Sequence, residues 1–168
     1  MSRFFKRSPT ESFVKVENEL NKTMLQIIQG SKEHSTLNAA LHIFPEIEPT
    51  LDSAKKTIVA PNDAAFAKLG IPAETLLVNK NKLKKVLMYH VTTKSINSQN
   101  VNETHKCVHD TLLEGSAWTH FYDEDDAEMV IQDALKSNAG ILKFVGAKNN
   151  CSILVVDTVL LPARWENL

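Results

Sequence analysis

Apolar residues in the first half of the chain recur at the spacing of helices. From about Glu11 they follow in steps of three and four, which predicts a helix that ends near Gly30. Its apolar face consists of Phe13, Val16, Leu20, Met24 and Ile27. A second helix is predicted from about Ser35 to the residue before Pro45, because a proline pushes its predecessor out of the helical region. A third is predicted over about residues 80–89, with an inner face of Leu83, Val86, Leu87 and His90.

Capping and strand signals divide the segment between the second and third helices. The hydroxyls of Ser35 and Thr36 can accept hydrogen bonds from the first amides of the second helix. Residues 45–56 are rich in proline and charge and are predicted to form a loop. Residues 57–60 are a short β-type run, after which Asn62 is expected to cap a short helix.

The second half of the chain has the pattern of strands. Short β-type runs, separated by polar or glycine-containing breaks, cover residues 105–114, 117–122, 128–132, 141–147 and 152–157. Asn149 and Asn150 lie between the last two runs and predict a tight hairpin, because asparagine accepts positive φ. Helices in the first half and strands in the second favour an α+β fold over a repeating βαβ sheet.

Composition and charge narrow the classes of function. The length of 168 residues fits one domain, and the net charge of −1 gives no electrostatic reason to expect nucleic acid. No apolar run approaches the ~20 residues of a membrane span, so no direct span is predicted. The first residues carry charge without an apolar core behind it, which argues against an intact secretory signal. The two cysteines, Cys107 and Cys151, permit at most one internal disulfide.

Four segments in the same order resemble the fasciclin (FAS1) family. Residues 57–69 run from a strand into Ala-Pro, a capping residue, an Asp and an Ala-Phe pair. Residues 83–91 end in Tyr-His-Val, residues 111–113 read Thr-Leu-Leu, and residues 152–162 end in Val-Asp-Thr-Val-Leu-Leu-Pro. The resemblance implies a single α+β domain, a wedge-shaped β-sandwich with helices packed at one side.

The resemblance also sets expected domain limits. It covers residues 24–162, which leaves residues 1–23 as an N-terminal arm with a helical extension and residues 163–168 as a C-terminal tail. In places the sequence departs from the family pattern: Asn62 stands where many members have Thr, Asn150 where Gly is common, and Thr158 where Gly is common. These departures leave the expected fold intact but put any inherited partner surface in doubt.

Tyr89 and His90 form the motif that animal members of the family associate with integrin-dependent adhesion, so the resemblance makes them partner-binding candidates. The alternative, which we favour, is that both rings are in the core, since His90 continues an apolar helix face.

Structural roles are expected for Asn62, Asp63 and Phe66 of the first motif and for Asp157 of the last. Asp157 stands within an apolar strand run, where a buried carboxylate needs hydrogen-bond donors, so it is expected to tie the last strand to a turn.

His105, Cys107 and His109 alternate along one predicted strand and would share one face. Imidazole and thiolate suit zinc or copper, with His120 or an acid from residues 123–126 completing the site. We favour the alternative that they form an ordinary polar strand face, and we predict no metal or cofactor. The acidic run at 123–126 lacks the spacing of a calcium loop and predicts a solvated turn.

Three sequons match the pattern for N-glycosylation, at Asn21, Asn102 and Asn150. Asn102 lies in a polar stretch and is the favoured candidate, whereas folding can mask the other two.

No catalytic motif is present, so the sequence predicts a non-enzymatic protein-interaction or adhesion module whose partner is another protein. One alternative is a subunit of a larger, organellar membrane assembly. Another is a carrier of an apolar ligand such as a lipid or carotenoid. The expected location is extracellular or at the cell surface if a signal was removed, and organellar otherwise.

Overall fold

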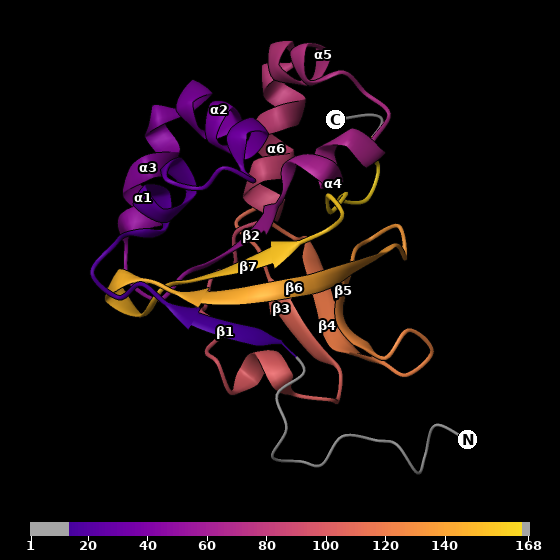
Figure 1. Cartoon of the computed structure of the whole chain (residues 1–168). Coiled ribbons are helices and arrows are strands. Elements are labelled where there is room, and N and C mark those ends of the chain that lie inside the picture. The colour runs from indigo at the N-terminus through magenta and orange to yellow at the C-terminus, as the bar shows by residue number, and fades with distance from the viewer. Residues whose placement is uncertain (1–13, 166–168) are drawn as a thin grey trace.

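A curled sheet with helices against one side forms the molecule (Figure 1). The computed structural model describes residues 14–165, and in that part of the chain seven strands pair in the order β2-β7-β6-β5-β4-β3, with β1 added beside β6. The strands are β1 (Lys15–Asn18), β2 (Thr57–Pro61), β3 (Cys107–Asp110), β4 (Ala117–Asp123), β5 (Glu128–Gln132), β6 (Asn138–Gly146) and β7 (Ser152–Val156).

The helices come mainly from the first half of the chain, as the α+β pattern predicts. They are α1 (Met24–Gln29), α2 (Ser35–Ile43), α3 (Glu48–Asp52), α4 (Asp63–Lys68), α5 (Ala73–Val78) and α6 (Lys80–Tyr89). Short 3-10 turns cover η2 (Pro45–Ile47), η3 (Asn100–Asn102) and η4 (Lys148–Asn150). No helix within residues 14–165 is long and apolar enough to cross a membrane.

Strand β6 is the longest strand and joins the two halves of the sheet. On one side it pairs antiparallel with β7. On the other side its first residues pair antiparallel with β5, and its last residues pair parallel with β1. The register against β7 shifts between Ile141 and Lys143, where Leu142 bulges and is exposed. This irregularity lets the sheet bend between its two halves.

Strands β2 and β7 are buried on both faces, and their sequences are apolar after the first residues, Thr57 and Ser152, whose hydroxyls bond each other (2.6 Å). Alternate residues serve two separate cores. Ile153 and Val155 of β7 pack with the helices, whereas Leu154 and Val156 pack inside the curl of the sheet against residues such as Trp118. Two cores on opposite faces of one strand pair explain why these two strands carry so little polarity.

Several predicted elements are confirmed. Helices α2 and α6 begin and end close to the predicted positions, and Pro45 ends α2. Residues 57–60 are in β2, and the five later runs overlap β3 to β7, although β6 begins at Asn138, before its predicted run. Asn149 and Asn150 both have positive φ, 64° and 57°, in the connection between β6 and β7, as predicted for the hairpin.

The helix predicted from about Glu11 is wrong over Lys15–Asn18, which form β1. Strand β1 pairs with β6, and this pairing provides hydrogen-bond partners for the backbone of β1. Leu20, a member of the predicted apolar face, is 61% exposed. The helix is present only from Met24, where the Thr23 hydroxyl accepts from the Gln26 amide and caps it. Residues 11–13 lie outside the described residues.

The loop predicted at residues 45–56 is partly wrong, because it contains η2 and α3. Pro45 and Pro49 sit in the first turns of these elements, where the missing amide has no partner to lose. The sequence pattern predicts no helix over residues 73–78, where the structure has α5.

Candidate functional site

Tyr89 and His90 at the end of α6 are both buried, at 0% and 2% exposure. The Tyr89 hydroxyl donates to the Ala117 carbonyl (2.8 Å) and accepts from the Ala134 amide (3.1 Å). Burial raises the pKa of the Tyr89 phenol to about 12. Tyr89 thus ties α6 to β4 and to the connection between β5 and β6, and its ring has no surface to offer a partner.

His90 connects α6 to the segment after β7. Its Nδ1 donates to the Val86 carbonyl (2.7 Å), and its Nε2 accepts from the Leu160 amide (3.0 Å). Both ring nitrogens are therefore used by a neutral imidazole. Burial lowers the pKa of His90 to about 4. The position of both rings agrees with the core alternative, and any partner must contact residues around the motif.

Asn62 and Asp63 organise two helices. Asn62 Oδ1 accepts from the Ala65 amide (2.8 Å) and caps α4, which carries the buried Phe66. The Asp63 carboxylate reaches α2, where it accepts from the Ser35 hydroxyl (2.7 Å) and the Thr36 amide (2.9 Å). The predicted cap of α2 by its own hydroxyls is therefore wrong: a carboxylate from another helix caps it. Burial acts to raise the pKa of Asp63, but the hydrogen bonds from Thr36 and Ser35 outweigh it and hold this pKa below the usual value.

Asp157 lies directly after β7 and is half-buried. Its Oδ1 accepts from the Gly140 amide (2.8 Å) and from the Thr158 hydroxyl (2.9 Å). It therefore ties the end of β7 to β6 instead of lying within the strand and holding a turn. A Cβ at Gly140 would come within 2.9 Å of Asp157 and 2.8 Å of Glu128, so the missing side chain leaves room for both carboxylates.

The three candidate metal ligands do not converge. Strand β3 begins only at Cys107, so His105 precedes it, is exposed, and pairs with Glu103 (3.2 Å). His109 instead contacts His120 on β4, with Nε2 to Nδ1 at 3.1 Å. No group of three His, Cys, Asp or Glu side chains within residues 14–165 is arranged to hold a metal ion.

The His109–His120 pair is a structural feature of its own. His120 is fully buried, and its Nε2 donates to the Val101 carbonyl (3.2 Å). Its Nδ1 therefore accepts the Nε2 proton of His109, so the His120 ring is neutral. Burial and the neighbouring His120 lower the pKa of His109 to about 4, and burial also lowers the pKa of His120.

The sequons differ in accessibility. Asn102 is half-buried, with Oδ1 accepting from the Val14 amide (2.9 Å) and Nδ2 donating to the Ser98 carbonyl (3.3 Å). Asn21 and Asn150 are exposed. The folded chain therefore presents these two more openly than Asn102, the reverse of the sequence ranking. Glycosylation of Asn102 stays a prediction.

A pocket of about 220 Å³ lies between α1 and strands β6 and β7, and we call it the α1 pocket. Its inner wall is apolar, and its rim is polar. The apolar residues are Ile27, Ile28, Val145, Ile153 and Val155, and the polar ones are Glu19, Lys22, Gln26, Ser31, His34 and Lys143, with Gly30 beside them.

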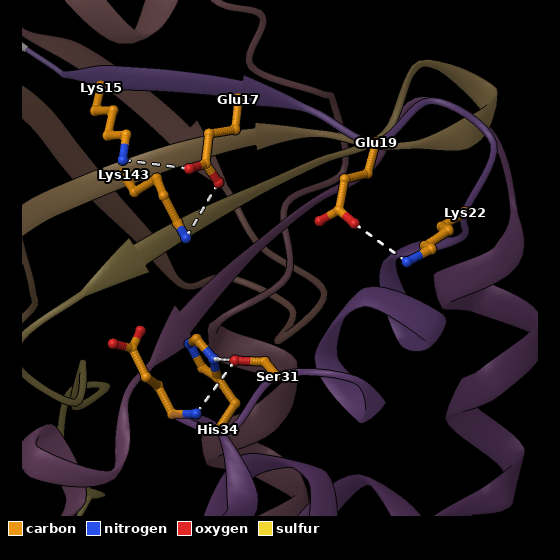
Figure 2. Close-up of polar contacts among 8 residues, drawn as sticks. Lys15, Glu17, Glu19, Lys22, Ser31, His34 and Lys143 are labelled. Carbon is orange, nitrogen blue, oxygen red and sulfur yellow. Dashed lines mark hydrogen bonds and ion pairs between the residues drawn. The ribbon is translucent and has the colours of Figure 1, made fainter.

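The rim of the α1 pocket carries ordered charges, drawn in Figure 2. Lys143 pairs with Glu17 (3.2 Å), and Glu17 also holds Lys15 (3.3 Å). Hydrogen bonds from Lys143 and Lys15 lower the pKa of Glu17. On the other side Lys22 pairs with Glu19 (3.3 Å).

The inner end of this rim holds a neutral histidine. His34 Nδ1 lies 2.7 Å from the Ser31 hydroxyl, and its Nε2 lies 3.3 Å from the Ala60 carbonyl. A carbonyl only accepts, so Nε2 carries the proton and Ser31 donates to Nδ1. Burial lowers the pKa of His34. Sequence reasoning missed this site, because its residues come from three distant segments with no shared motif.

A second pocket, of about 390 Å³, lies beside α4 and α5. Its polar end consists of Thr36 and Asp63. The rest of the lining is mainly apolar and includes Phe66, Ala67, Ile71, Pro72 and Leu76.

The sequence of this chain is similar to a known family and to several known proteins. A family model described as a fasciclin domain matches residues 15–162. The cell surface glycolipoprotein MPB83 of Mycobacterium bovis is 30% identical over 135 residues, 76% of this chain and 55% of MPB83. Protein sll1483 of Synechocystis sp. is 31% identical over 145 residues, 83% of this chain and 73% of that protein. The chain thus spans about half the length of the mycobacterial relative.

A solved structure gives the same fold. A FAS1 domain pair from the insect cell adhesion molecule fasciclin I aligns with a TM-score of 0.55 at 20% identity, covering 74% of this chain and 46% of that one. The alignment confirms the predicted α+β fold with helices packed at one side, and the predicted wedge-shaped β-sandwich is formed by one curled sheet.

Proposed function

This chain belongs to the fasciclin domain family, and from that premise we propose that it is a non-enzymatic protein-interaction module acting at a cell surface or outside the cell. The observation that carries the proposal is the fasciclin match over residues 15–162. Members of this family are generally adhesion and surface proteins without catalytic activity. A relative named as a cell surface glycolipoprotein supports the location.

We propose the outer edge of β3 as the surface that meets the partner. Val108 on this edge strand is 71% exposed, an unusual position for a large apolar side chain. Within the described residues, β3 pairs along one side with β4, and near its other side the Asp110 carbonyl accepts from the Thr93 amide. An extended segment of another protein can add to such an edge and cover Val108.

The experiment compares two equally exposed valines. The unmodified chain is crosslinked to its partner in material from the native source, and the Val108→Lys variant should no longer capture that partner. Val78→Lys, on α5 with 74% exposure, should leave capture unchanged. Capture of the same partner by both variants would move the surface away from β3. Absence of any specific partner for the unmodified chain would overturn the interaction module itself.

The carrier alternative is favoured by one observation, the apolar pocket of about 390 Å³ beside α4 and α5. That volume lies at the small end of the range for ligand sites, about 300–1,000 Å³, so it suits a lipid fragment better than a full carotenoid. Native protein that is colourless and free of extractable lipid would argue against this function.

The assembly alternative and the location are tested together by intact mass and native size. A glycosylated chain of monomeric size supports a surface module. An unmodified chain that migrates in a much larger particle supports a subunit of an organellar assembly, and the proteins that migrate with it would name the neighbours.

A further inference from the structure

The α1 pocket combines an apolar wall with a cationic rim, and we propose that it binds a small aliphatic monocarboxylate. This site is separate from the β3 edge, so the inference stands or falls independently of the interaction proposal. The argument rests on the volume and lining of the pocket, on the balance of its charges, and on the pairing of Lys143.

The wall of the pocket suits a small apolar group. Ile28, Val145 and Ile153 are between 2% and 3% exposed, so they form a rigid surface from α1, β6 and β7. A volume of about 220 Å³ holds about seven water-sized groups at about 30 Å³ each. A ligand of about six carbons therefore fits with its polar end at the rim.

The charges of the lining favour an anion. The ion pairs of the rim hold one more ammonium group than carboxylates. The ammonium groups are Lys15, Lys22 and Lys143, and the carboxylates are Glu17 and Glu19. His34 adds no charge, because its neutral ring is bonded to Ser31 and to the Ala60 carbonyl. A cationic or neutral head group would find fewer partners at this rim than a carboxylate.

Lys143 can accept a second carboxylate without stranding its present partner. Glu17 is held by both Lys15 and Lys143 (Figure 2), so it keeps one ion pair when Lys143 turns toward a ligand. The ammonium group also has three donors, and the contact with Glu17 occupies one of them. We therefore assign the ligand carboxylate to Lys143 and the chain to the apolar wall.

Sodium hexanoate is the probe, titrated into the labelled chain at pH 7.5 and followed by NMR. A small ligand of about eight non-hydrogen atoms should bind with a Kd of about 1 mM. Saturable shifts are expected at Ile28, Val145 and Ile153. Hexan-1-ol, hexylammonium and leucine should each bind at least about fivefold more weakly, since they lack the lone carboxylate charge.

Two variants separate the pocket from general adsorption. Lys143→Met keeps the aliphatic stem and should weaken hexanoate binding about tenfold, whereas Lys85→Met, an exposed lysine on α6, should change nothing. Gly30→Leu should also weaken hexanoate binding, because the added side chain occupies part of the α1 pocket. Gly30 has φ −84° and its Cβ would make ordinary contacts, so the fold tolerates a side chain that narrows the pocket.

The proposal is overturned if hexanoate causes no saturable shifts at the wall residues. It is also overturned if hexan-1-ol or hexylammonium binds as well as hexanoate, or if Lys85→Met weakens binding as much as Lys143→Met. Tighter binding of leucine than of hexanoate would reassign the site to a zwitterion held between Lys143 and Glu19.

Discussion

Single polar atoms join segments of this chain that are far apart in sequence, and the Tyr89 hydroxyl is the clearest case. Tyr89→Phe removes both of its bonds and leaves the Ala117 carbonyl and the Ala134 amide without this partner. We expect the free energy of unfolding to fall by about 1–3 kcal/mol, measured by urea denaturation with an unchanged m-value. A change below about 0.5 kcal/mol would mean that water replaces the hydroxyl at both groups.

Asp63 is the other residue whose loss should be felt far from its own helix. Asp63→Ala removes the cap of α2, and we expect a loss of about 1–2 kcal/mol in the same measurement. Asp52→Ala, an exposed aspartate at the end of α3, is the matched control and should stay within about 0.5 kcal/mol. Equal effects in both variants would show that general charge, and not the cap, sets the stability.

At the scale of elements, local signals predicted most of the fold. Helix α6 and the end of α2 at Pro45 follow from side-chain spacing and backbone sterics alone. Strand β1 was mistaken for a helix because Val16 and Leu20 happen to follow helical spacing, while pairing with β6, more than a hundred positions away, decides the conformation. Such non-local pairing leaves no periodic signal in the strand itself.

The candidate site was less predictable than the fold. The core position of Tyr89 and His90 follows from the apolar face that His90 continues. The α1 pocket brings together the segment around α1, Lys143 and the end of β7, and no spacing within any of these predicts the others. The contact between His109 and His120 depends on the register of β3 against β4, which the sequence does not specify.

The hairpin between β4 and β5 supports a prediction about backbone strain. Ala127 has φ 54°, a left-handed conformation that side chains disfavour. Ala127→Gly should therefore raise the free energy of unfolding by about 0.5–1 kcal/mol. Ala134→Gly, in the turn between β5 and β6 where φ is not positive, should lower it by a similar amount, about 0.5–1 kcal/mol. A loss of stability in both variants would contradict the strain at Ala127.

For the whole molecule, the buried histidines predict a loss of stability in mild acid. The pKa values of His90 and His109 are about 4, below the ordinary value of 6.5, so the unfolded chain binds more protons than the folded one. The contribution of these two rings to the free energy of unfolding is fully present above pH 6.5 and declines as the pH falls toward 4. For His90 alone, the expected loss between pH 7.5 and 5.0 is about 2 kcal/mol, measured by urea denaturation.

A variant separates the contribution of the His109–His120 pair from the rest of this pH dependence. His109→Gln should shrink the loss between pH 7.5 and 5.0, because one titrating ring is gone. The charged groups near the pair are Asp110 and Glu103, which favour protonation, and His105, which opposes it. An unchanged pH dependence in His109→Gln would mean that His109 keeps its ordinary titration in the folded chain.

The pairing of β6 also determines how the fold resists mechanical load. Strand β1 starts beside Lys143, and β7 ends beside Ile141, so the chain enters and leaves the sheet at the same end of β6. A force applied at Lys15 and Val156 therefore pulls both strands away from β6 one hydrogen bond at a time, instead of shearing all the bonds together. Under tension the fold should open by unzipping from this end, at a low force set by its unfolding rate.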